Sequence, residues 1–94
     1  MRMDVIELLS SRGRLKILVS LLKYGELNIS ELARRSGLNH VITDKHVRAL
    51  EELGLVSETR LGRVRLVKLN SERPEIKLLE ELIKKWPSPE AHEG

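Results

Sequence analysis

The chain contains no cysteine and no phenylalanine, and its 94 residues include one tyrosine, Tyr24, and one tryptophan, Trp86. Without cysteine, disulfides, thiolate zinc sites, iron–sulfur clusters and cysteine nucleophiles are excluded. With so few aromatic residues, the core has to be built from leucine, isoleucine and valine. A long apolar run is also missing, so we expect no membrane span. Because the first ten residues lack the apolar centre of a signal peptide, we expect a cytoplasmic protein.

Charge is unevenly distributed along the chain. Lys+Arg 17 against Asp+Glu 14 gives a net charge of +3. Residues 60–70 alone carry four basic and no acidic side chains. Such crowding of like charges destabilises a short segment, and an anionic partner would explain why it is there. The 33% of charged residues, together with the absence of glutamine and cysteine, favours a thermophile as the source.

The N-terminal third reads as helical. A short helical turn is expected over residues 4–9, and an amphipathic helix over residues 12–23, ending at Gly25. The apolar residues that recur at helical spacing, and that we expect to be buried, are Leu15, Leu18, Val19 and Leu22.

Two further helices follow a short extended bridge at residues 27–29. Ser30 is expected to cap a helix over residues 31–35, which Gly37 ends. Asn39 is expected to cap a longer helix over residues 39–53. The side chains that we expect on the buried face of the longer helix are Thr43, Val47, Leu50 and Leu53.

From Val56 onward the apolar period becomes that of strands. Residues 57–61 and 64–69 are expected to form a β-hairpin that turns at Gly62. Pro74 suits the first turn of a final helix over residues 73–86. Residues 1–86 are therefore predicted to form one domain with its core in residues 8–69, and residues 87–94 a disordered tail. The predicted fold class is mainly α with a small β-hairpin (α+β).

Three stretches resemble one family. Residues 14–18 resemble the start of the first core helix of the archaeal and bacterial winged-helix repressors of the ArsR and MarR type. Residues 29–38 resemble their I-x-E-L-A-x-x-x-G-L helix and turn, and residues 47–56 the end of their recognition helix. The resemblance covers about two-thirds of the chain and implies a winged helix-turn-helix that binds double-stranded DNA and regulates transcription.

The resemblance implies that helix 39–53 enters the major groove, where an α-helix fits. The outward-facing residues that we expect to reach DNA from this helix are His40, Val41, Asp44, Lys45 and Arg48. Asp44 either accepts from cytosine or pairs with Lys45 or Arg48, because a lone carboxylate near phosphates weakens binding.

The hairpin, residues 57–69, forms the wing and is expected to contact the backbone and the minor groove. Its candidate DNA-binding residues are Arg60, Arg63, Arg65 and Lys68. Arg34 and Arg35 are further candidates for DNA binding. An equally good explanation is that they only keep the surface of their helix solvated. The alternative for the wing is that its basic residues do not bind DNA but keep the exposed edge strand solvated and so discourage aggregation.

Other kinds of site find little support. His40 and His46 lie six residues apart, roughly 240° around a helix, so they do not converge on a metal ion. We expect no metal site and no cofactor. The sequence contains no Ser/His/Asp arrangement and no glycine-rich phosphate loop, so we expect no enzyme.

The last helix carries an apolar stripe that needs a cover. Its members are Ile76, Leu79, Leu82, Ile83 and Trp86. The favoured interpretation is a homodimer interface, which would place two recognition helices one DNA turn apart. The stripe could also fold back onto the domain itself. A third hypothesis, a winged-helix protein–protein adaptor, uses the stripe to dock a different protein.

Overall fold

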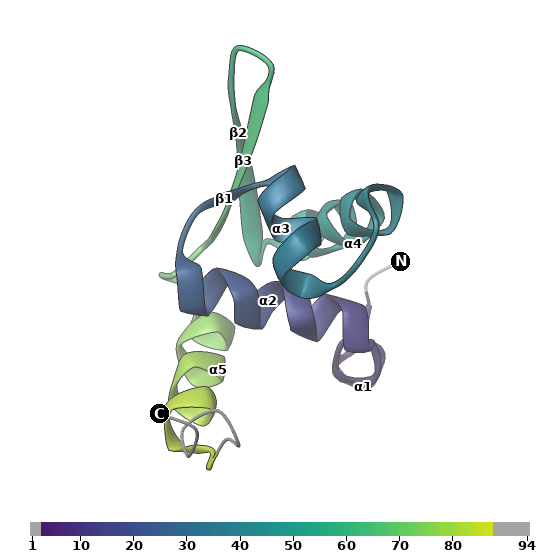
Figure 1. Ribbon diagram of the computed structural model, residues 1–94. Helices are drawn as coiled ribbons and strands as arrows, with labels where there is room; N and C mark the ends of the chain where they lie inside the picture. Colours follow the sequence, from purple (N-terminus) through teal and green to yellow (C-terminus); the bar gives the residue numbers. More distant parts are fainter. Residues whose placement is uncertain (1–2, 88–94) are drawn as a thin grey trace.

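The computed structural model describes residues 3–87, which form five helices and three strands (Figure 1). The helices and strands are α1 Val5–Ser10, α2 Arg12–Tyr24, β1 Leu27–Asn28, α3 Ile29–Ser36, α4 His40–Glu52, β2 Val56–Leu61, β3 Val64–Leu69 and α5 Pro74–Lys85. The predicted order of helices and strands is therefore confirmed. Of the expected tail, residues 87–94, all but Pro87 lie outside the described residues.

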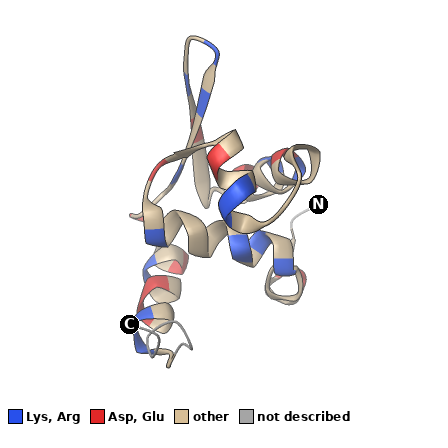
Figure 2. Ribbon diagram, in the orientation of Figure 1, with Lys and Arg blue, Asp and Glu red and all other residues tan. Residues whose placement is uncertain are grey.

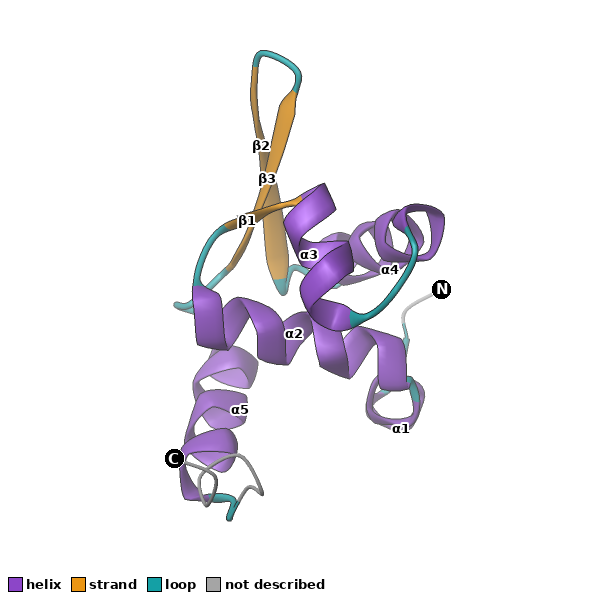
Figure 3. Ribbon diagram, viewed as in Figure 1, coloured by secondary structure: helices purple, strands orange, loops and turns teal. Residues whose placement is uncertain are grey.

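The strands form one antiparallel sheet in the order β1-β3-β2. The β2–β3 hairpin pairs Leu61 with Val64 next to its tip, and Gly62 at the turn has φ 62°. This positive φ favours glycine. The hairpin projects beyond the helices, whereas α1 and α5 lie on the opposite side of α2 (Figures 1 and 3).

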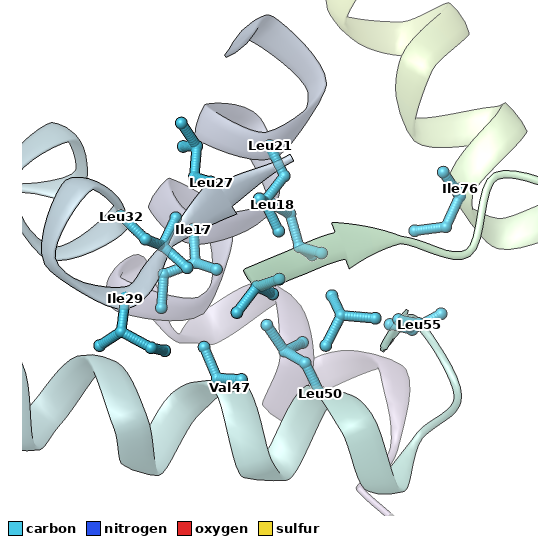
Figure 4. Packing of buried hydrophobic residues seen from close by; sticks show 12 residues of the cluster. Ile17, Leu18, Leu21, Leu27, Ile29, Leu32, Val47, Leu50, Leu55 and Ile76 are labelled. Carbon is cyan, nitrogen blue, oxygen red and sulfur yellow. The ribbon is translucent and has the colours of Figure 1, made fainter. Parts of the chain in front are cut away.

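The core is aliphatic, as the composition predicts, and joins all the major elements (Figure 4). It has the following buried members: Ile17, Leu18, Leu21, Leu27, Ile29, Leu32, Val47, Leu50, Leu55, Val56, Val67 and Ile76. Because α2, α3, α4 and the base of the hairpin share this cluster, the core sets the orientation of the long helix relative to the hairpin.

The buried face of α2 differs from the expectation. Leu18 is buried as expected, but its buried companions are Ile17 and Leu21. Leu15, Val19 and Leu22 are only half-buried. The expected stripe was therefore rotated from the true buried face, because α3, α4 and β3 together contact α2 on the side of Ile17.

The start of α3 also differs from the expectation. The helix begins at Ile29 and its cap is Asn28, whereas the sequence predicts the cap at Ser30. The Asn28 side chain accepts from the Glu31 amide at 2.8 Å, and the Glu31 carboxylate accepts from the Asn28 amide at 3.4 Å. This reciprocal capping box satisfies two amides that the first turn would otherwise leave unpaired.

The apolar stripe of α5 divides between the protein's own core and the surface. Ile76 is only 3% exposed and Leu79 packs against the same cluster, so these two side chains fold back onto the domain. The expectation that Ile76 belongs to a dimer interface is therefore wrong. Leu82, Ile83 and Trp86 remain exposed. Leu78, which was not predicted to belong to the stripe, is 70% exposed.

Candidate nucleic-acid interface

The turn between α3 and α4 determines how α4 begins. Gly37 caps α3 in the left-handed conformation, with φ 70° and ψ 28°, which glycine adopts at little cost. Asn39 then caps α4 as predicted, because its side chain accepts from the Ile42 amide at 2.8 Å. The Thr43 hydroxyl donates to the Asn39 carbonyl at 2.8 Å. These bonds fix the first turn of α4 directly after the turn at Gly37.

Burial of one side of α4 exposes the other. Thr43, Val47 and Leu50 are fully buried as expected, whereas Leu53 is half-buried. The exposed members of the predicted reading face are His40, Val41, Lys45 and Arg48. Val41 is 76% exposed whereas its neighbour Ile42 is half-buried, so an apolar contact with a thymine methyl is open to Val41.

Asp44 and Arg65, both predicted to contact DNA, contact each other in the structure. The Arg65 guanidinium donates to Asp44 on α4, and also to Glu58 on the neighbouring strand at 2.8 Å. Asp44 in addition accepts from Arg48 at 3.0 Å. Of the two roles left open for Asp44, pairing with basic residues is the one seen. Its partner Arg65 could not be named from the sequence.

These ion pairs shift ionisation in the direction that keeps all three groups charged. Hydrogen bonds from Arg65 lower the pKa of Asp44 and that of Glu58 below their ordinary values. The hydrogen bonds to Glu58 and Asp44 raise the pKa of Arg65. Because the Arg65 side chain is 20% exposed and satisfied on two sides, its main role in this structure is to join the wing to α4.

Other wing cations point into solvent. Arg60 and Arg63 are exposed near the Gly62 turn. The Arg60 Nε atom lies 3.8 Å from the Glu58 Oε2 atom. Lys68 is exposed at the base of the hairpin, where it lines a shallow depression together with Glu26 and Glu80. The structure therefore places Arg60 and Arg63 together at the tip and separates Lys68 from them.

A depression of about 250 Å³ connects the wing with the helices. Its lining residues are Asn28, Ile29, Ser30, His40, Arg63, Val64 and Arg65. The N-terminus of α3, the first residue of α4 and the wing thus surround one hollow. Asn28 and Ser30 were not predicted as site residues from the sequence, although the spacing of Asn28 and Glu31 is that of a capping box. Helix N-termini favour phosphate because their amides point outward.

Arg34 and Arg35 lie at the other end of α3. They occupy its last turn, and the Arg35 guanidinium stacks on the Tyr24 ring at 3.9 Å from the ring centre. Together with residues of α1 and α2 they line a different hollow. The structure therefore does not bring these two arginines to the face formed by α4 and the wing.

His46 lies on the inner side of α4 and packs on α2. A Cβ atom added to Gly13 would lie 2.6 Å from the His46 Nε2 atom, so the glycine leaves room for the imidazole. Burial, together with the charges of Arg14 and Lys45, lowers the pKa of His46.

Within residues 3–87, His, Asp and Glu side chains form no group of three that could hold a metal ion. Over the same residues, no helix is both long and apolar enough to cross a membrane.

The family model for bacterial regulatory proteins of the arsR family matches residues 11–58. The chain belongs to this family. The matched region covers α2, β1, α3, α4 and the start of β2, and it ends before the tip of the wing. No curated protein sequence matches the chain.

Several solved structures are similar to this chain over most of its length. Reduced HlyU from Vibrio cholerae N16961 has a TM-score of 0.71 at 28% identity, over 84% of this chain and 80% of that one. The winged helix-turn-helix domain Mb0332 from Mycobacterium bovis has a TM-score of 0.69 at 28% identity, over 85% of this chain and 71% of that one. NolR from Sinorhizobium fredii has a TM-score of 0.70 at 26% identity, over 86% and 79% respectively.

Family and fold agree with the resemblance that the sequence motifs indicate. This ArsR-family protein is a winged helix-turn-helix, DNA-binding transcriptional regulator. Its family and fold are those of regulators rather than of enzymes.

Proposed function

We propose that this regulator reads double-stranded DNA with the exposed face of α4 in the major groove and with the tip of the wing on the backbone and in the minor groove. The observation that supports this most is the hollow shared by the N-terminus of α3, His40 and Arg63. The amides that the capping box leaves free at this helix start, together with the nearby Arg63, suit a phosphate. We further propose that the protein acts in the cytoplasm.

The exposed residues have distinct roles in this arrangement. Lys45 and Arg48 reach base edges or phosphates from α4, with His40 and Val41 nearer the start of the helix. Arg63 at the tip suits the narrow minor groove, where negative potential is concentrated. Arg60 contacts phosphates. Arg65 holds the wing at a fixed angle to α4, and Lys68 lies too far along the hairpin to join the tip.

The regulator acts as a homodimer in this proposal. Mb0332, at 28% identity, is described as a homodimeric DNA-binding domain. The apolar side chains left exposed on the last helix are Leu78, Leu82, Ile83 and Trp86, and on the first helix Val5, Ile6 and Leu9. Both helices lie on the side of α2 away from the wing (Figure 1). A two-fold contact there leaves both reading faces free and spaces them for two successive turns of DNA.

The salt dependence of binding to a labelled duplex tests the DNA proposal. The change is Arg60→Gln combined with Arg63→Gln. Each cation withdrawn from the DNA lowers the log–log slope of affinity against salt by about 0.9, so the double variant is expected to lose up to about 1.8 for each bound protomer. Lys84→Gln with Lys85→Gln removes the same charge from α5 and is the matched control; sedimentation checks that it keeps the wild-type oligomeric state, and its slope should then be unchanged.

Two outcomes contradict the proposal. An identical slope for the wing variant and the wild type removes the wing from the interface. Failure of the wild type to bind duplex even at low salt favours the adaptor alternative, in which exposed residues of α5 dock another protein.

A further inference from the structure

A second basic surface lies away from the proposed DNA interface. Figure 2 shows basic segments along α2 and on the neighbouring end of α3. Between these segments lies a hollow of about 670 Å³, which extends along α2 from the end of α1 to Tyr24. Its cations are Arg12, Lys16, Lys23, Arg34 and Arg35.

The charge of this hollow is not balanced from within. Among the described residues that line it, none is acidic. Arg12, Lys16 and Arg34 form no ion pair with a carboxylate in residues 3–87, whereas cations on α5 such as Lys84 and Lys85 each have one. Mutual repulsion among these cations disfavours the arrangement, and a bound anion would relieve it.

The aromatic ring at one end helps to position the charges. Arg35 stacks on Tyr24 at 3.9 Å from the ring centre, and the Lys23 ammonium lies 5.6 Å from the same centre. Such stacking fixes the plane of the guanidinium and leaves its edge to donate. An arginine held in this way is suited to two-pronged hydrogen bonding with phosphate oxygens.

The size and place of the hollow indicate a small ligand. Pockets of about 300–1,000 Å³ hold small molecules. Leu15 and Val19 add half-buried apolar surface. The hollow meets α3 at its C-terminal turn, whereas the proposed phosphate contact lies at its N-terminus, about 12 Å away along an eight-residue helix.

We propose that the hollow between α2 and the end of α3 binds a small molecule with two or more phosphate groups. A single carboxylate would leave at least one of Arg12, Lys16 and Arg34 unbalanced, whereas a di- or triphosphate balances all three. Phosphates of a DNA backbone share this chemistry, so the experiment has to separate the two sources.

The test is calorimetric titration of the full chain with sodium tripolyphosphate, and with labelled duplex in parallel. Arg12→Gln with Lys16→Gln removes two exposed cations of the hollow. Arg60→Gln with Arg63→Gln removes the same charge from the wing. We expect the hollow variant to bind tripolyphosphate about tenfold more weakly or worse, and the wing variant to bind it as the wild type does.

Thermal melting of each variant checks that it is folded. Equal weakening by both variants shows non-specific attraction and overturns the proposal, as does undiminished binding by the folded hollow variant. If the hollow variant weakens duplex binding and not tripolyphosphate binding, the hollow is a DNA contact, which also overturns it. Should the wild type bind no duplex, the tripolyphosphate result still decides the hollow, because it does not depend on the DNA proposal.

Discussion

Arg65 on β3 donates to Asp44 on α4, twenty-one positions earlier in the chain, while its guanidinium also bonds to Glu58 on β2. One side chain thereby joins the wing to the helix that we propose reads DNA. A winged helix-turn-helix needs both elements to meet one duplex at a set spacing. The basic residue nearest the centre of the interface is therefore engaged within the protein, and the contact with DNA falls to its exposed neighbours.

Replacing Arg65 should destabilise the protein. In Arg65→Gln, Asp44 and Glu58 lose the charged donor that they share and keep only the more exposed Arg48 and Arg60 as partners. We expect the free energy of unfolding to fall by about 1–2 kcal/mol, since the site is partly screened by solvent. Urea denaturation measures this. Arg60→Gln is the matched control, because the Arg60 side chain is 67% exposed and lies 3.8 Å from Glu58. If the free energy of unfolding falls as little as it does in the control, the bonds of Arg65 with Asp44 and Glu58 contribute little to stability.

The same cluster predicts how stability depends on acid. Arg65 lowers the pKa of both Asp44 and Glu58 in the folded protein. Groups of this kind stabilise the fold fully above their unfolded pKa values, near 4, and the contribution is lost as pH falls through the lower folded values. We expect the wild type to lose stability from about pH 5 downward more steeply than Arg65→Gln. Urea midpoints across this range measure the difference, and parallel curves would contradict the expectation.

His46 should add a second pH dependence, closer to neutral. Burial and the charges of Arg14 and Lys45 lower its pKa in the fold below the ordinary value of 6.5. The unfolded chain therefore takes up the proton first, so stability falls as pH drops through 6.5 toward the folded value. Replacement by the neutral His46→Gln should flatten the urea midpoint between pH 8 and pH 5. A slope that survives this replacement would have to come from another group.

Much of this arrangement can be predicted from local sequence. Asn39, Gly37 and Gly62 mark a helix start and two turns through their own chemistry, and all three act as expected. The join at Arg65 could not be predicted, because the sequence does not tell which face of β3 turns toward α4. The rotated face of α2 has a similar cause, since its apolar residues cover more than one side and only packing with α3, α4 and β3 decides between them.

Gly13 offers a test of how closely α2 and α4 pack. Alanine normally stabilises a helix relative to glycine by about 0.5–1 kcal/mol. Here the new Cβ would meet His46 at 2.6 Å. We expect Gly13→Ala to destabilise the wild type and to stabilise His46→Ala, with a coupling of about 1–2 kcal/mol between the two positions. A double-mutant cycle in urea measures this coupling, and additive effects would show that the ring moves away at no cost.

The proposed dimer can be tested at Leu82, which is 52% exposed on α5. A charge at this position would be buried without a partner in a two-fold contact, so Leu82→Glu should shift the protein to the monomer. Sedimentation velocity measures the oligomeric state. Leu61→Glu is the matched control for sedimentation alone, because Leu61 is 61% exposed, away from α5 and on the wing that we propose contacts DNA. Loss of the dimer should also reduce affinity for a two-site duplex far more than for a single site, because the second contact is no longer intramolecular. A Leu82→Glu protein that still sediments as the wild type does would exclude this part of α5 from the interface.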